Sequence, residues 1–180
     1  MSWLEMARQN PTLAAFGEER LNGRVAYLAT VGENGRPRVY PVTPLLRDDR
    51  LFIFMYPTSP KGHDLERGSW YALHCAVEGN DGGAGEFSVR GVGHRAMDPD
   101  AWELVRPGHA DELNTRYVLF ELEVGQALAT TYEDDREIRT RWSAGGPAAE
   151  RAPTANPRNP LAPSSQPASP ARRSAPRPPA

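Results

Sequence analysis

The chain has 180 residues, a formal net charge of −2 and a single cysteine, Cys75. This length predicts one domain with a buried core and leaves room for a tail. One cysteine cannot form an internal disulfide or a thiolate metal site, and we expect Cys75, in an apolar run, to be a small buried hydrophobic residue. The sequence contains neither an apolar run long enough to cross a membrane nor a signal-peptide pattern, which predicts a cytoplasmic protein.

Residues 147–180 differ in composition from the rest of the chain. They contain ten prolines and, from residue 151 onward, five arginines and no acidic residue, whereas residues 1–150 carry 16 basic and 23 acidic residues. Leu161 is their only bulky apolar side chain, so the segment cannot bury enough surface to offset its loss of conformational entropy. We predict a disordered Pro/Ala/Arg-rich tail after a domain of residues 1–146. The tail has no aromatic residues for base stacking, which argues against nucleic acid as a partner.

The N-terminal half of the domain is predicted to contain one helix followed by strands. The helix spans residues 11–22, with Asn10 as its cap, a proline at its first position and an Asn-Gly pair as its stop signal. The first two strands are joined by the hairpin turn GENG. The predicted strands span residues 24–31, 36–46 and 51–56.

The second of these strands, RPRVYPVTPLL, contains Pro37, Pro41 and Pro44. Proline has no backbone N–H and cannot donate a ladder hydrogen bond, which confines it mainly to edge strands. We therefore expect this strand to lie at the edge of a sheet, or to present part of its backbone to a bound ligand.

The C-terminal half of the domain continues with strands that one short helix interrupts. Strands are expected at 70–77, at 86–97 and within RYVLFELEVGQALATTYE, and Asp98 caps a helix that ends near Arg106. This order does not form alternating βαβ units, which argues against a Rossmann fold. The GVGHRA sequence is not followed by an uninterrupted helix, so we expect its glycines to mark a bulge or a close backbone approach.

Other side chains that could carry chemistry form no clear pattern. The four histidines show no pair at the i, i+4 spacing of a helical metal site, so no metal is predicted. Trp142, just before the proline-rich segment, either folds over a cofactor or lies on the surface, and the sequence leaves both interpretations open.

The turn SPKGHDL contains the only lysine of the chain, Lys61. Ser59-Pro60 repeats the pattern of Asn10-Pro11, which predicts a short helix over residues 60–67. Backbone N–H groups, two hydroxyls and one ammonium group would then meet at the helix start, where an anion is stabilised. A lysine in a first turn is unfavourable without an anion, so the turn predicts an anion site. An ordinary capped helix with a solvated lysine is the alternative.

The segment LATVGENGRPRVYPVTPLL, followed by an apolar strand and SPKGHDL, resembles the pyridoxamine 5′-phosphate oxidase-like family of flavin-binding split barrels. The resemblance covers residues 11–130 and depends on the combination of these motifs. It implies a mainly β fold with a few short helices, an antiparallel six-stranded split β-barrel. It also implies a homodimer with two flavins at the interface between the subunits.

The same resemblance implies residues that bind the cofactor, FMN. In the family, the serine and lysine of the turn and the arginine of the second strand bind the flavin phosphate, which indicates Ser59, Lys61 and Arg38 here. The backbone of the second strand lies against the flavin ring, and a short segment leads into the phosphate loop. The further cofactor-binding residues are Val39, Tyr40, Pro41, Val42, Met55, Tyr56, Pro57 and Thr58.

A bound flavin passes a hydride through its own ring, so no catalytic residue is assigned. We predict an FMN-dependent oxidoreductase that acts on a small-molecule substrate. Three alternatives stay open: a deazaflavin-dependent reductase of the same fold, a non-catalytic flavin or haem carrier, and an interaction module without a cofactor.

Overall fold

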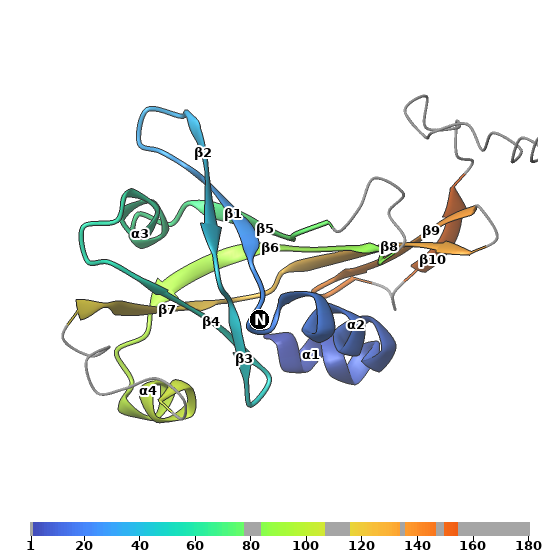
Figure 1. Cartoon of the computed structure of the whole chain (residues 1–180), viewed down its shortest axis with the longest axis horizontal. Helices are drawn as coiled ribbons and strands as arrows, with labels where there is room; N and C mark the ends of the chain where they lie inside the picture. Colours follow the sequence, from blue (N-terminus) through green and yellow to red (C-terminus); the bar gives the residue numbers. More distant parts are fainter. Residues whose placement is uncertain (1, 78–83, 107–115, 134–135, 147–149, 155–180) are drawn as a thin grey trace, which may run out of the picture.

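The computed structural model describes residues 2–77, 84–106, 116–133, 136–146 and 150–154. These residues form mostly strands, with four short helices (Figure 1). No helix among them is long and apolar enough to span a membrane, and the cytoplasmic location stays a prediction. The helices are α1 (Trp3–Gln9), α2 (Pro11–Leu21), α3 (Pro60–Glu66) and α4 (Pro99–Val105). The strands are β1 (Ala26–Val31), β2 (Pro37–Val42), β3 (Leu45–Arg47), β4 (Arg50–Met55), β5 (Trp70–Cys75), β6 (Glu86–Arg95), β7 (Val118–Leu122), β8 (Gln126–Glu133), β9 (Arg136–Ser143) and β10 (Glu150–Thr154).

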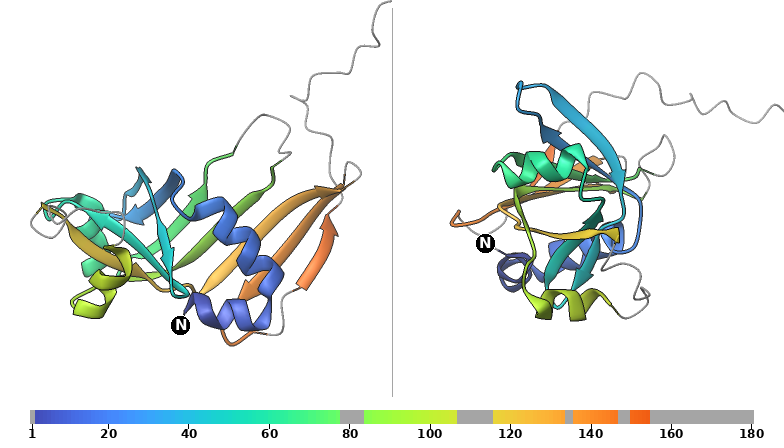
Figure 2. Two further views of the ribbon diagram at one scale, coloured as in Figure 1. Left: turned by 60° about the horizontal axis from the view of Figure 1, so that its bottom comes forward. Right: turned by 90° about the vertical axis from the view of Figure 1, so that its left-hand side faces the viewer.

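The strands pair antiparallel and form two connected half-sheets, which curl around a common core (Figure 2). The larger half-sheet has the order β10-β9-β8-β6-β5-β1-β2, and β3, β4 and β7 form the smaller one. The two are joined at β6, which pairs with β5 and β8 along most of its length and with β7 at residues 93–95. This arrangement confirms the predicted split-barrel class. The described residues form ten strands rather than six: β8, β9 and β10 continue the larger half-sheet past β6, and β3 is a further strand of three residues.

The change of partners along β6 requires a close approach between two backbones. A Cβ atom at Gly91 would overlap the carbonyl oxygen of Glu123, so only glycine fits at this position. Beside it, the Gly125 N–H donates a hydrogen bond to the Arg90 carbonyl at 2.8 Å. The hydroxyl of Tyr71 also donates to the Glu123 carbonyl, at 3.0 Å. The expectation that the glycines of GVGHRA mark a close backbone approach is therefore confirmed for Gly91, whereas a Cβ atom at Gly93 would meet the side chains of Leu122 and Leu65.

β2 lies at the edge of the larger half-sheet, where its pairing among the described residues is with β1 alone. The edge position predicted from the prolines is thus confirmed. The single strand predicted over 36–46 is wrong, because the chain leaves β2 after Val42 and enters β3 of the other half-sheet at Leu45. Pro44 stands at this transition, where it has no N–H to donate to a ladder. Its carbonyl accepts the Gly23 N–H at 2.8 Å.

The core lies between the half-sheets, and α1 and α2 close one side of it. β4 is buried on both faces: Ile53 belongs to the main cluster, and Phe52 packs with Val105 of α4 in a second cluster. Cys75 is 1% exposed, which confirms that it is a buried residue. Both interpretations of Trp142 are wrong, because its side chain is 2% exposed and belongs to the main core.

The N-terminal helices show what the sequence predicted and what it missed. α2 begins at Pro11 as expected, and the Asn10 side chain accepts the Leu13 N–H at 2.9 Å. α1 was not predicted, because its start lacks the proline that marks α2; in the structure its N-cap side chain makes no hydrogen bond. Its Trp3 and Met6 are nevertheless among the buried residues of the core.

The structure places β10 within the stretch 147–180 that the sequence predicts to be a disordered tail. The backbone of β10 pairs with β9 over residues 137–141. Residues 147–149 and 155–180 lie outside the described residues, so the division of the chain into a domain of 1–146 and a tail stays a prediction.

We predict that Gly17→Ala destabilises the protein, although alanine is the better helix former. A Cβ atom at Gly17 would overlap the ring of Phe87, which is fully buried, so the core would have to repack. We expect the free energy of unfolding to fall by about 1–3 kcal/mol in urea denaturation, the usual cost of overpacking. As a control for helix propensity, Ala15→Gly on the exposed face of α2 should cost about 1 kcal/mol. A G17A protein more stable than the wild type would contradict this packing.

Candidate functional site

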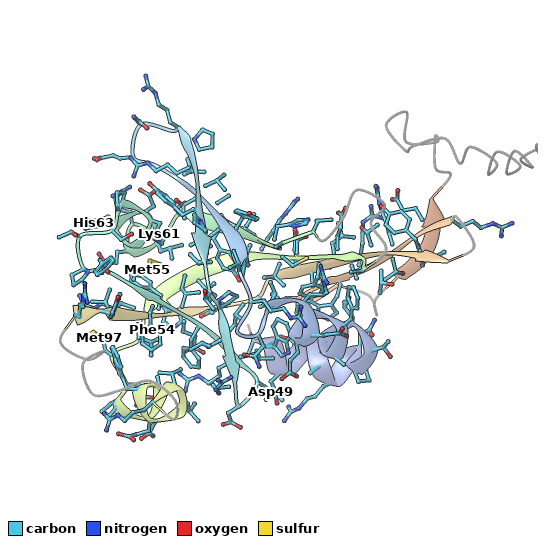
Figure 3. All side chains as sticks on the ribbon, viewed as in Figure 1. Asp49, Phe54, Met55, Lys61, His63 and Met97 are labelled. Carbon is cyan, nitrogen blue, oxygen red and sulfur yellow. The ribbon has the colours of Figure 1, made fainter. Side chains whose placement is uncertain are left out.

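Lys61 lies on α3 (Figure 3), which packs against β1 and β6 and reaches the edge strand β2 through side chains. The helix begins at Pro60 as predicted and ends at Glu66, one residue earlier than expected. The Lys61 ammonium nitrogen is 4.9 Å from the centre of the Tyr40 ring. Burial lowers the pKa of Lys61. Because burial disfavours the charged form, an anion beside this ammonium group would stabilise it.

The next turn of α3 brings Asp64 against Arg38 of β2. The carboxylate of Asp64 is fully buried. Its Oδ2 atom is 3.4 Å from Arg38 Nη1 and accepts a hydrogen bond from Thr30 Oγ1 at 2.9 Å. Its other oxygen pairs with the guanidinium group of Arg67. The carboxylate therefore connects β1, β2 and the C-terminal end of α3.

The spacing of these residues explains why two cations meet here. Lys61 and Asp64 are three residues apart on a helix and share one of its faces. Arg38 and Tyr40 are two residues apart on a strand and share one face of the sheet. α3 therefore places Lys61 over Tyr40 and Asp64 beside Arg38. The predicted phosphate-binding residues Arg38 and Lys61 are brought to the same face of β2.

A glycine makes room for the arginine. Gly32 lies in the turn between β1 and β2, and a Cβ atom there would lie 3.0 Å from Nη2 of Arg38. Its N–H donates to the Arg36 carbonyl at 2.9 Å, which closes the hairpin. A side chain at this position would press on the guanidinium group, so the turn keeps the space around Arg38 open.

Ser59 stands at the N-cap position of α3 and is 8% exposed. Its N–H donates to the Tyr56 carbonyl at 2.9 Å, and its carbonyl accepts the His63 N–H at 3.2 Å. The prediction that its hydroxyl caps the helix is wrong, because that side chain forms no capping hydrogen bond. Ser59 therefore belongs to a tight turn that leads directly to Lys61.

Tyr56 forms an aromatic pair beside this turn that the sequence did not predict. The Tyr117 hydroxyl donates to the Tyr56 hydroxyl at 3.2 Å, and their ring centres are 4.8 Å apart. The guanidinium carbon of Arg116 is 5.7 Å from the centre of the Tyr56 ring. The hydrogen bond from Tyr117 and the positive charge of Arg116 lower the pKa of Tyr56. These partners come from the segment before β7, far along the chain, so no local pattern could have indicated them.

The remaining predicted cofactor residues lie on different surfaces. Val42 is buried at the inner end of β2, whereas Val39 and Pro41 are exposed on the opposite face of that strand from Arg38. Met55 is buried beneath α3, and a Cβ atom at Gly62 would lie 3.6 Å from its sulfur. Two further residues of the turn, Pro57 and Thr58, are exposed. The assignment of these residues to a cofactor stays a prediction.

The outer face of the larger half-sheet carries many exposed apolar side chains. The strand register places Ala29 opposite both Val39 and Ala72, and Trp70 opposite Val92, so these strands present one continuous face. A pocket of about 350 Å³, lined in part by Trp70 and Val92, opens beside it and does not include the Lys61 cluster. Arg90 and His74 share this face, opposite Ala72 and Tyr27. Exposed apolar side chains in this number often mark an interface. Its exposed large apolar side chains are Val25 (51%), Tyr27 (47%), Val31 (48%), Val39 (63%), Trp70 (59%) and Val92 (37%).

These features define an antiparallel split-barrel protein with a cationic cluster at one sheet edge. The sequence profile described as pyridoxamine 5′-phosphate oxidase matches residues 14–130, which is more than half of the chain. The chain therefore belongs to the pyridoxamine 5′-phosphate oxidase-like family, as the motifs predicted. No curated protein matches the sequence.

Solved structures of this fold include proteins that bind different molecules. PhzG of Burkholderia lata 383, in complex with tetrahydrophenazine-1-carboxylic acid, has a TM-score of 0.56 and 19% identity over 84% of this chain and 92% of that chain. A pyridoxamine 5′-phosphate oxidase-related, FMN-binding protein of Nostoc punctiforme PCC 73102 has a TM-score of 0.55 and 13% identity over 85% and 94%. HutZ, the haem storage protein of Vibrio cholerae, has a TM-score of 0.50 and 15% identity over 64% and 89%. At these identities the likeness shows the fold alone.

We predict that Tyr117→Phe raises the pKa of Tyr56 toward its ordinary value, because the substitution removes the hydrogen bond that contributes most to lowering it. The measurement is an NMR titration of protein with ¹³C-labelled tyrosine. Tyr132→Phe, on β8, serves as the matched control and should leave the titration of Tyr56 unchanged. An unaltered Tyr56 titration in Y117F would show that the hydroxyl pair does not form in solution.

Proposed function

We propose that this protein binds FMN, with the flavin phosphate held between Lys61 and Arg38, and acts as an oxidoreductase on a small molecule. The observation that carries this proposal is that Lys61, over the Tyr40 ring, and Arg38, beside Asp64, lie on the same face of an edge strand. Ammonium and guanidinium groups bind phosphate through charge-assisted hydrogen bonds, which are stronger than neutral ones. Ser59, in the turn that precedes Lys61, supplies a hydroxyl close to the same helix start.

The charges of the cluster match a phosphate monoester. Lys61, Arg38 and Arg67 are cations and Asp64 is an anion, which leaves two net positive charges. A phosphate monoester carries about 1.5 to 2 negative charges at neutral pH. Gly32 gives the Arg38 guanidinium group room to lie against the turn between β1 and β2. The residues present therefore fit the phosphate end of FMN.

The edge position of β2 supports the placement of the flavin ring. A ligand whose phosphate lies beside Arg38 on one face of β2 would cross the free edge of this strand to reach Val39 and Pro41, which are exposed on the other face. When bound, FMN supplies hydride transfer through its own ring. The chain then contributes binding, orientation and the exclusion of water, and no side chain is required to transfer a proton.

We also propose that the exposed apolar face is the interface of a homodimer and that the partner subunit covers the flavin. The face includes Val39 of β2, so it reaches the same strand as the phosphate cluster. Obligate interfaces commonly bury more than about 2,000 Å² and are rich in apolar side chains. A flavin enclosed between two subunits would be shielded from water, as hydride transfer requires.

The absorption spectrum of the purified protein tests the cofactor. FMN bands, together with release of FMN on denaturation, support the proposal. Deazaflavin bands would show that the cofactor is the deazaflavin coenzyme and not FMN; its phosphate would bind to the same cluster. Haem bands would contradict the proposed oxidoreductase and indicate a haem carrier. A colourless protein that takes up none of these cofactors on addition would leave only the interaction module.

We predict that Lys61→Ala weakens FMN binding by about 1.5–3 kcal/mol, the range for a hydrogen bond to a charged group. Riboflavin, which has no phosphate, should lose much less affinity. The measurement is a flavin fluorescence titration of apoprotein. Arg36→Ala removes one positive charge from an exposed position near the same hairpin and is the matched control, with no expected change. Equal FMN affinity in the wild type and K61A would contradict the phosphate site.

We predict that Trp70→Asp converts the dimer to a monomer and lowers its FMN occupancy. Trp70 is 59% exposed, so an aspartate there is solvated in the isolated subunit but buried without a partner in the dimer interface. Analytical ultracentrifugation with and without FMN measures both effects. Met97→Asp, at an apolar residue that is 77% exposed beyond the end of β6 (Figure 3), is the control and should remain dimeric. A wild-type monomer that binds FMN with full affinity would contradict the shared site.

A further inference from the structure

We propose that Asp64 is a positioning residue, which holds the Arg38 guanidinium in the orientation that the phosphate requires. This inference rests on the proposed FMN site and adds a residue that does not itself touch the cofactor. Asp64 is fully buried at the centre of the cluster, and its carboxylate reaches Arg38, Thr30 and Arg67.

The position of Asp64 is not explained by electrostatic attraction of a phosphate. A carboxylate close to an anion site repels the ligand, because like charges within a few ångströms disfavour each other. Burying a carboxylate also costs desolvation free energy unless it is paired and hydrogen-bonded. A neutral side chain would give the cluster a larger positive charge. The presence of Asp64 therefore indicates a benefit that is geometric rather than electrostatic.

The contacts of the carboxylate define this geometric role. The Thr30 hydroxyl donates to Oδ2 and Arg67 binds Oδ1, so neither oxygen is free to turn away. Thr30 is 1% exposed and lies directly opposite Arg38 in the register of β1 and β2. Oδ2 thus meets Arg38 Nη1, at 3.4 Å, from a fixed position. The carboxylate thus holds Nη1, and in this proposal the remaining N–H groups of the guanidinium fork bind a phosphate oxygen.

The position of Arg38 explains why it needs such a tether. The Arg38 side chain is 34% exposed. A long arginine side chain that is partly exposed samples many rotamers unless it is held. A ligand that binds a mobile arginine must pay for ordering it, whereas a fixed guanidinium group is ready to bind. Asp64 removes this cost before the phosphate arrives. Lys61 gains no such support from the Asp64 contacts described above, because its ammonium group packs on Tyr40.

The test compares FMN with riboflavin in the wild type, Asp64→Asn, Arg38→Gln and the double variant, by fluorescence titration of apoprotein. The ratio of the two affinities reports the phosphate alone, so a general loss of stability does not change it. If Asp64 positions Arg38, D64N lowers the FMN-to-riboflavin ratio about tenfold, the loss of one charge-assisted hydrogen bond. If charge alone matters, D64N raises the ratio, because a negative charge has been removed. In the R38Q background, D64N should change the ratio less than about twofold, because its effect passes through Arg38.

The outcomes separate this inference from the proposed function. A wild type that prefers FMN to riboflavin, with an unchanged or increased preference in D64N, overturns the positioning role and leaves the FMN site standing. A wild type that shows no preference for FMN overturns both. If D64N does not fold, Asp64→Glu takes its place, since it keeps the charge but moves the carboxylate by one methylene. An unchanged ratio in D64E then overturns the proposal, and a lower ratio supports it.

Discussion

The shape of the molecule depends on the close contact between the backbones of Gly91 and Glu123. At this point β6 stops being a strand of one half-sheet and becomes a strand of the other, and any side chain at Gly91 would separate them. The hydroxyl of Tyr71 and the amide of Gly125 donate hydrogen bonds beside the contact, so its polar groups are satisfied. Two half-sheets held in this way enclose one core and leave β2 with a free edge.

The free edge and α3 together create the cationic cluster. Asp64 of α3 binds one side chain from each of β1 (Thr30) and β2 (Arg38), and Arg67 at the C-terminal end of its own helix. A buried carboxylate that loses its hydrogen-bond donors costs free energy of folding. Asp64 therefore also stabilises the packing of the elements that supply its three donors. The same residue therefore links the stability of the barrel edge with the geometry of the site.

Local signals in the sequence were reliable where the chemistry is local. Asn10 and the Ser59-Pro60 pair mark the starts of two helices, and the prolines of β2 indicate an edge strand, because each depends on neighbours in the chain. Thr30 and Asp64 lie 34 residues apart, and their contact depends on strand register and on how α3 packs, which no local pattern encodes. The Tyr56–Tyr117 pair spans 61 residues and was missed for the same reason. The family motifs indicated Arg38 and Lys61. They indicated neither Asp64, whose carboxylate contacts Arg38, nor Thr30, which donates a hydrogen bond to that carboxylate.

The hydrogen bond from the Trp142 indole to the Gln9 side chain, at 2.7 Å, joins residues 133 positions apart. Trp142 fills the core beside α1, so the first helix has no complete surface to pack on until the ninth strand has been made. During synthesis, the apolar residues of α1 must therefore wait for almost the whole barrel to leave the ribosome. Long-range closure of this kind slows folding and prolongs the exposure of apolar surface.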